Sequence, residues 1–230
     1  MRGGSIGIAV VAAVAAVLGL SLVGCGGAEA TSPRQVADQL NETDAALRSA
    51  IDGWRAAEDP PSSPPPEEVS SEAIELQEQV RFLARHPNLT ADVIPLLSGK
   101  VAAEIRRLTA ASRALIRLSA GIPDKKFKVG PPPPLAELAS HYDEAKNRIG
   151  IDQHYLAAIH FVETRFGRVK SNSVAGAQGP MQFIPSTWKV YGRALFAYNP
   201  SRLYVAAVSH YAKLVARDPY ALYYLYSWQP

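Results

Sequence analysis

The sequence predicts a mainly α-helical protein, and two observations lead to that prediction. Apolar residues recur at intervals of three and four over most of residues 33–120 and again after residue 152, which is the spacing of one helix face. Hydrophobic residues make up 47% and charged residues 20% of the 230 residues, which is ordinary for a globular chain and excludes a fibrous or wholly disordered one. This length allows one or two domains.

Net charge and cysteine content exclude several classes of function. The formal net charge is only +3, so a nucleic-acid partner held by bulk electrostatics is not expected. The chain has a single cysteine, which excludes a disulfide framework and any Cys-rich zinc or iron–sulfur site.

The first 25 residues have the pattern of a secretion signal. Arg2 precedes an uncharged, mostly apolar run over residues 6–23. The run ends in Leu22-Val23-Gly24-Cys25, which resembles the bacterial lipobox, where the cysteine is lipidated after cleavage. We therefore expect a lipoprotein signal peptide over residues 1–24, with Cys25 anchoring the mature chain to a membrane outside the cytoplasm. An uncleaved membrane anchor is the alternative, because about 18 apolar residues can just span a bilayer.

Two proline-rich segments divide the remaining chain. Residues 59–66 and 130–134 are too rich in proline for the interior of a helix or sheet. The second segment separates a helical N-terminal region, residues 25–130, from a C-terminal domain, residues 131–230.

The N-terminal region has helical patterns but no residues at catalytic spacing. It holds 13 Lys and Arg against 15 Asp and Glu. Thr90 is placed to cap a short helix that begins at Ala91. The narrow apolar stripes favour a small bundle or hairpin that acts as a spacer or supporting module, with a partner-binding coiled coil as the alternative. The stripes are Val36, Leu40, Leu47, Ile51 and Trp54, then Ala73, Leu76, Val80 and Leu83, then Val101, Ile105, Leu108, Ala111 and Leu115.

The C-terminal domain differs in composition. Its 100 residues hold 10 Lys and Arg against 6 Asp and Glu, and 16 of the 19 aromatic residues. A basic, tyrosine-rich module is consistent with an anionic, sugar-containing ligand, because aromatic faces stack on sugars and Tyr hydroxyls donate hydrogen bonds. The alternative is that much of the tyrosine fills the core.

One glutamate lies on the apolar face of a predicted helix. Asp152 is placed as the N-cap of a helix that runs through about Phe166. Glu163 comes four residues after Ile159 and three before Phe166, so it shares their face. Burial and the nearby helix C-terminus both disfavour a negative charge there and raise the pKa of a carboxyl group.

A carboxyl group with a raised pKa is what a general acid requires. Glu163 is therefore a candidate catalytic acid, and an ion pair with Arg165, Arg168 or Lys170 is the structural alternative. His160 lies three residues before Glu163, but no third metal ligand accompanies the pair, so no metal is expected. We interpret His160 as a core or pocket-rim residue.

A glycine-rich segment follows over residues 171–183. Gly176 and Gly179 permit close approach of the backbone, and the neighbouring Ser, Asn and Gln side chains offer uncharged hydrogen bonds suited to acetamido sugars. An ordinary connecting loop remains the alternative.

Three separated motifs together resemble a known family. They are Val162-Glu163-Thr164-Arg165-Phe166-Gly167, Gly176-Ala177-Gln178-Gly179-Pro180-Met181-Gln182-Phe183 and Ala197-Tyr198-Asn199. Their order and content resemble the lytic transglycosylases of the soluble type, which have a lysozyme-like fold. The resemblance covers roughly residues 135–230, and the signal peptide and helical N-terminal region resemble actinobacterial members.

The resemblance implies a site and a reaction. Glu163 matches the family's catalytic acid, which cleaves the β-1,4 bond between N-acetylmuramic acid and N-acetylglucosamine in peptidoglycan and leaves a 1,6-anhydromuramoyl end. No cofactor is implied, and the partner is the peptidoglycan glycan strand. The implied substrate-binding residues are Ser173, Gly179, Met181, Gln182, Phe183, Tyr198 and Asn199.

The distribution of Asp and Glu residues agrees with a reaction that needs only one catalytic carboxylate. Ordinary glycosidases use two carboxylates, but residues 165–217 contain no Asp or Glu. Asp218 follows in a stretch that we expect at the surface. One carboxylate therefore acts twice in the predicted mechanism, first as acid and then as base.

The C-terminal domain departs from the family in length. The family usually has a further helix between the Trp188 motif and the Ala-Tyr-Asn motif, whereas here Gly192 is followed almost directly by Ala197. A catalytically impaired, peptidoglycan-binding lipoprotein on the same fold is therefore an alternative, and a hydrolysing lysozyme is another.

Overall fold

The computed structural model describes residues 32–120, 128–170, 199 and 201–230, which contain eight α-helices and one short 3-10 helix. Within these ranges there is no β-sheet, and Val129 and Val169 form an isolated antiparallel bridge. The predicted mainly α-helical class is confirmed. The expectations for the signal peptide and for the glycine-rich segment fall on residues 1–31 and 171–198, outside the described residues.

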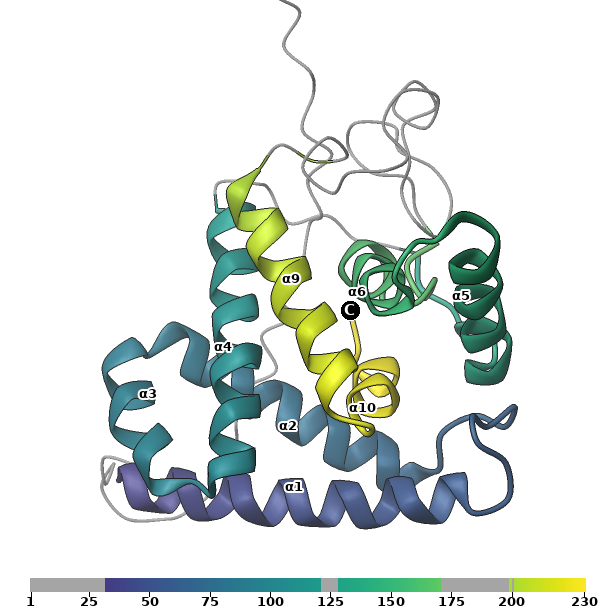
Figure 1. Ribbon diagram of the computed structural model, residues 1–230. Coiled ribbons are helices and arrows are strands. Elements are labelled where there is room, and N and C mark those ends of the chain that lie inside the picture. The colour runs from purple at the N-terminus through teal and green to yellow at the C-terminus, as the bar shows by residue number, and fades with distance from the viewer. Residues whose placement is uncertain (1–31, 121–127, 171–198, 200) are drawn as a thin grey trace, which may run out of the picture.

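Residues 32–120 fold into the helices at the base and left of Figure 1. Ser32 begins the first helix with a capping box: its hydroxyl accepts from the Gln35 N–H at 3.2 Å, and the Gln35 side chain accepts from the Ser32 N–H at 2.8 Å. The elements are α1 (Pro33–Arg55), α2 (Glu67–Arg85), α3 (Pro87–Val93), the 3-10 helix η1 (Ile94–Leu96) and α4 (Gly99–Ser119).

Thr90 does not cap a helix, so that prediction was wrong. It lies inside α3, which already begins at Pro87 because proline is well suited to the first helical position. Its buried hydroxyl donates to the carbonyl oxygens of Leu83 at 2.6 Å and His86 at 2.9 Å. Thr90 therefore ties α3 to the end of α2.

The C-terminal helices begin at side-chain caps of the kind that the sequence indicates. Asp152 caps its helix by accepting from the His154 N–H at 2.8 Å, which confirms the predicted start. Ser201 caps the next described helix by accepting from the Tyr204 N–H at 3.3 Å. The elements are α5 (Leu135–Ile149), α6 (Gln153–Thr164), α9 (Arg202–Arg217) and α10 (Ala221–Ser227).

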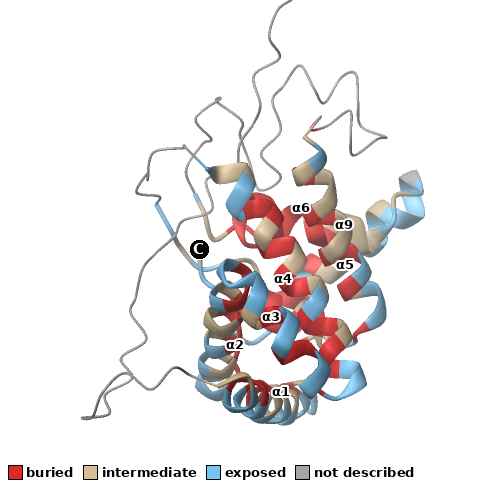
Figure 2. Ribbon diagram, turned by 90° about the vertical axis from the view of Figure 1, so that its left-hand side faces the viewer, coloured by how far each residue is buried: buried red, intermediate tan, exposed pale blue. Residues whose placement is uncertain are grey.

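One hydrophobic core joins the two regions of the chain. Helix α9 lies between α4 and α6, and α10 packs beside α2 (Figure 1). Figure 2 shows the buried residues on the facing sides of these helices. The ring of Phe161 on α6 lies 4.7 Å from that of Tyr211 on α9 and 5.8 Å from that of Trp228. The N-terminal region therefore packs directly against the helices that carry the candidate site.

Core filling accounts for most of the described tyrosines. Six of the eight are buried, so the composition of the C-terminal domain reflects its core more than a ligand surface. The buried ones are Tyr142, Tyr204, Tyr211, Tyr223, Tyr224 and Tyr226.

A buried ion cluster around Arg48 ties the N-terminal region to the end of α9. The Arg48 guanidinium donates to both carboxylate oxygens of Asp218, at 3.0 and 2.9 Å, and to Glu104 of α4 at 2.6 Å. Asp44, one turn earlier on α1, accepts from Arg48 Nε at 2.8 Å. Asp218 is only 7% exposed, so the expectation that it lies at the surface was wrong. It is buried because it has a cation to pair with that lies 170 residues away in the sequence.

The three carboxyl groups of this cluster share one cation and therefore titrate differently. Burial, and then the charge of Asp218, raise the pKa of Glu104 to about 8. Burial likewise raises the pKa of Asp44. The pKa of Asp218 is lowered, because hydrogen bonds from Arg48 and from the Tyr220 N–H outweigh its burial. At neutral pH the cluster therefore holds an ionised Asp218 and a protonated Glu104.

None of the described helices is both long enough and apolar enough to cross a membrane.

The first prediction concerns the replacement of Arg48 by methionine. Arg48→Met leaves buried carboxylates without a cation, and we expect the free energy of unfolding to fall by about 3–5 kcal/mol. Urea unfolding followed by circular dichroism measures this. The control is Arg34→Met, which removes an exposed pair with Asp38 and is expected to cost about 0–0.5 kcal/mol. Equal losses in the two variants contradict the account.

The second prediction concerns the pH dependence of stability. Glu104 has a pKa of about 8 in the folded chain against an ordinary 4.5, so between these values the folded state holds one more proton than the unfolded state. Its contribution to stability is complete below pH 4.5 and is lost as the pH rises, by up to about 1.4 kcal/mol per pH unit. Glu104→Gln removes this loss, so wild type should weaken relative to the variant between pH 5 and about 8. The control is Glu137→Gln, which replaces an exposed glutamate. If it changes the slope of stability against pH as much as Glu104→Gln does, the role assigned to Glu104 is wrong.

Candidate active site

Glu163 is buried in the last turn of α6, as its spacing predicts. Its exposed fraction is 7%, and Phe161 and Val162 beside it are almost fully buried. The helix is apolar on most sides because it is packed against both α5 and α9. The carboxyl group of Glu163 therefore sits at a helix end, within the core rather than on the surface.

The backbone turns sharply directly after this carboxyl group. The helix ends at Thr164, two residues earlier than predicted, because Arg165, Phe166 and Gly167 all have positive φ angles, at 52°, 57° and 83°. Glycine adopts this conformation freely, but for Arg and Phe it costs about 1–2 kcal/mol each. Burial of the Phe166 ring offsets part of that cost, and the Thr164 hydroxyl accepts from the Gly167 N–H at 2.9 Å.

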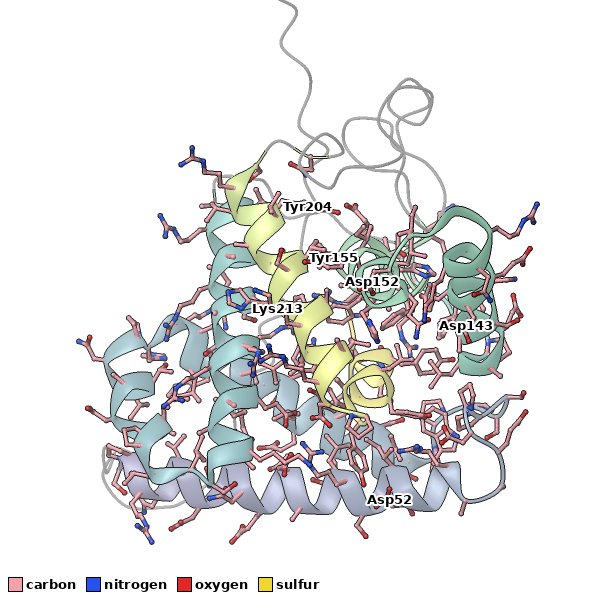
Figure 3. The ribbon with its side chains drawn as sticks, viewed as in Figure 1. Asp52, Asp143, Asp152, Tyr155, Tyr204 and Lys213 are labelled. Carbon is pink, nitrogen blue, oxygen red and sulfur yellow. The ribbon has the colours of Figure 1, made fainter. Side chains whose placement is uncertain are left out.

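Among the described residues, Tyr204 contacts the carboxyl group of Glu163 directly. Its hydroxyl donates to Oε1 of Glu163 at 2.7 Å, and its side chain is fully buried. Tyr204 lies in the first turn of α9, and Figure 3 labels it near the upper end of that helix. A short, buried hydrogen bond of this kind fixes the orientation of the carboxyl plane.

Asn199 helps to place Tyr204 by shaping the start of α9. It is 2% exposed, and its side-chain oxygen accepts from the Ser201 N–H at 3.0 Å. Ser201 in turn caps α9 at the Tyr204 N–H. Asn199 thus supports the turn before α9, and through α9 it positions the phenol that contacts Glu163.

The three cations proposed as ion-pair partners of Glu163 are used elsewhere. Arg165 donates to the Phe161 carbonyl oxygen at 3.0 Å, Arg168 to that of Tyr226 at 3.1 Å, and Lys170 to that of Pro131 at 3.0 Å. The Arg165 guanidinium also lies over the Phe161 ring, 4.2 Å from its centroid, and burial lowers its pKa to about 10. Arg165 therefore bonds back to α6, while Arg168 and Lys170 tie the segment after α6 to α10 and to the proline-rich segment.

His160 is a core histidine, which confirms its interpretation. It is 5% exposed, its Nδ1 lies 2.8 Å from the hydroxyl of Tyr142, and burial lowers its pKa to about 4. It is therefore neutral at physiological pH. No group of three or more potential metal ligands is found in the described part of the chain.

The structure links two of the predicted site residues to each other, and it identifies one further site residue that the sequence did not predict. Glu163 and Asn199 are linked through α9, and Tyr204 was missed by the sequence reasoning. A signal for Tyr204 was available, because it stands seven residues before Tyr211 and so shares one helix face with it, and both side chains are buried. The remaining predicted residues lie outside the described residues: Cys25, Ser173, Gly179, Met181, Gln182, Phe183 and Tyr198.

Comparison of the chain with protein-family models, with curated proteins and with solved structures finds no match.

The third prediction concerns the bond between Tyr204 and Glu163. Tyr204→Phe removes a buried donor and should lower the free energy of unfolding by about 1–3 kcal/mol. In a Glu163→Leu background, where the acceptor is absent, the same change should cost much less, and urea unfolding of the four proteins measures the difference. Tyr155→Phe, on the half-buried side of α6, is the matched control with an expected change within about 0.5 kcal/mol. An equal cost of Tyr204→Phe in both backgrounds contradicts the contact.

Proposed function

We propose that the chain is a peptidoglycan lytic transglycosylase in which Glu163 acts as general acid and then as general base. The observation that carries the proposal is a carboxyl group buried at a helix end and held on Oε1 by the Tyr204 hydroxyl. A buried, oriented carboxyl group is suited to deliver a proton to a leaving oxygen and to take one back.

The proposed reaction needs no water. Glu163 protonates the glycosidic oxygen as its bond to C1 of N-acetylmuramic acid breaks, and the acetamido oxygen of the substrate stabilises the positive centre. The 6-hydroxyl oxygen then bonds to C1, and its proton returns to Glu163. The products are a free 4-hydroxyl on N-acetylglucosamine and a 1,6-anhydromuramoyl end.

The positions of the other carboxylates support a single-carboxylate mechanism. Paired glycosidase carboxylates lie about 5–9.5 Å apart. Asp152 caps the opposite end of α6, eleven residues or about 16 Å along the helix from Glu163. Asp218 lies fourteen residues beyond Tyr204, at the far end of α9, and is paired with Arg48. Neither of these carboxylates is placed to act as a second group.

The packing of the N-terminal region supports a working C-terminal domain despite its apparent shortening. Helix α4 packs along α9, which carries Tyr204, and α2 packs against α10, so two helices from outside the family-like region each cover a helix of that region. A lysozyme-like arrangement, a saccharide groove lined by Gly179, Met181, Gln182, Phe183, Ser173 and Tyr198, and a lipid anchor at Cys25 in the cell envelope belong to the same proposal.

The fourth prediction tests this function. The full chain in neutral detergent should release soluble 1,6-anhydromuropeptides from purified sacculi, and Glu163→Gln should lower the rate by at least about 100-fold because the proton donor is lost. Liquid chromatography with mass spectrometry identifies the products.

The control is Glu144→Gln, which removes an exposed carboxylate paired with Arg148 on α5 and should leave the rate unchanged. Binding of wild type to sacculi without soluble product would instead favour the impaired, peptidoglycan-binding alternative. Reducing ends that carry one additional water would indicate a hydrolysing lysozyme.

A further inference from the structure

Helices α4 and α9 lie side by side and run in opposite directions along the front of the molecule (Figure 1). Each has one face buried against the core and one face toward solvent. Helix α4 has 21 residues, so the pair presents a surface about 30 Å long.

The solvent face of α4 carries cations and small residues. Lys100, Arg106 and Arg117 are exposed, and Arg107 is partly exposed. The positions between them on this face include the alanines at 103 and 110. The only carboxylate of α4 is Glu104, which is buried and bonded to Arg48, so this face carries no negative charge.

The solvent face of α9 has the same character. Arg202, Lys213 and Arg217 are exposed, and His210 is partly exposed between them. The intervening positions include Ala206, Ser209 and Ala216, and α9 contains no Asp or Glu at all.

The two faces join into one surface. His210 has its pKa lowered by burial and by the positive charges of Lys213 on its own helix and Arg107 on α4, which places these cations close together across the helix pair. Figure 3 labels Lys213 where the two helices meet. We call this surface the basic strip, and it comprises Lys100, Arg106, Arg107, Arg117, Arg202, Lys213 and Arg217.

The cations of the basic strip are not used for pairing within the described chain. The ion pairs of that part of the chain involve Arg34, Arg48, Arg55, Arg148 and His154, and none involves a cation of the strip. Helix α2, by contrast, has five Glu against two Arg. A net charge of +3 therefore conceals a surface on which α4 and α9 present seven cations and expose no carboxylate of their own, with the mostly buried Asp44 of α1 near Lys100 at one end.

From this surface we propose that the basic strip binds a linear phosphodiester polymer through its charged backbone. The cations recur along both helices: Lys100, Arg107 and Arg117 stand about 10 and 15 Å apart along α4, and Arg202, Lys213 and Arg217 stand about 16 and 6 Å apart along α9. Arginine and lysine bind phosphate oxygens strongly, and small residues between them allow close approach.

The composition of the strip favours this partner over others with the same charge. No Phe, Tyr or Trp is exposed on α4 or α9, and the partly exposed imidazole of His210 is the one aromatic ring among the cations, so stacking on a neutral glycan or on successive nucleobases is not supported. Most residues between its cations are Ala and Ser, and Ile116 beside Arg117 is the one large apolar side chain that the described α4 and α9 expose, at 38%. A single isoleucine does not make the continuous apolar face by which surface helices enter a bilayer. The feature of a ligand that the strip is suited to recognise is therefore the repeated negative charge of a polymer backbone.

The fifth prediction uses the full chain in neutral detergent and fluorescently labelled synthetic poly(glycerol phosphate) as the probe. The triple variant Arg107→Gln, Arg117→Gln, Lys213→Gln should weaken binding at least about tenfold at low salt, because three of seven cations are lost. The slope of log affinity against log salt should fall by about two, because fewer counterions are released. Fluorescence anisotropy over a salt series measures both quantities.

The matched control loses the same charge outside the strip, through Arg34→Gln, Arg85→Gln and Arg148→Gln. It should bind the polymer as wild type does, and both triples should keep the wild-type circular dichroism and melting temperature. The proposal is overturned if both triple variants lose the same affinity for the polymer. It is also overturned by equal or tighter binding of hyaluronate, a carboxylate polymer, or by strip-dependent binding to phosphatidylglycerol vesicles without binding to poly(glycerol phosphate). Because the strip lies on the side of α9 opposite Tyr204, Glu163→Gln should leave this binding unchanged even if the proposed reaction fails.

Discussion

The placement of α9 between α4 and α6 is the constraint on which the rest of the structure depends. One side of this helix carries Tyr204 to the carboxyl group of Glu163, and its solvent face carries three cations of the basic strip. Its C-terminal cap is Asp218, whose carboxylate is held by Arg48 of α1. A shift of α9 by one turn, about 5.4 Å, would break the contact at Glu163 and the ion cluster together.

The N-terminal helical region therefore bears directly on the candidate site. The buried cluster of Arg48, Asp44, Glu104 and Asp218 costs desolvation energy, and its value lies in fixing the register of α9 against α1 and α4. The apolar contacts along α4 and α9 supply the stabilisation, since burial of apolar surface is not directional. The ion cluster sets the register of α9, and the apolar core supplies the stability. Together they hold the Tyr204 hydroxyl within hydrogen-bond distance of the Glu163 carboxyl group.

Local patterns predicted the helices and the carboxyl group, but not the contacts between distant segments. Apolar spacing placed Glu163 on a buried face, and a polar residue before the pattern identified Asp152 as a cap, because both depend on neighbours within one or two turns. Asp218 was misjudged and Tyr204 was missed because their partners, Arg48 and Glu163, are set by tertiary packing. Thr90 was misjudged for a local reason, since α3 already begins at Pro87. Asp218 stands beside Arg217 in a polar stretch, and nothing nearby in the sequence indicates that Arg48 will bury it.

The proposal that Glu163 acts twice, without water, is tested most directly by digesting sacculi with the full chain in water enriched in oxygen-18. The account predicts soluble muropeptides whose new ends carry no oxygen-18 and lack the elements of one water. Reducing ends labelled with oxygen-18 would show that water attacks the substrate, and the absence of any soluble product would show that Glu163 does not cleave it. Either result would contradict the account.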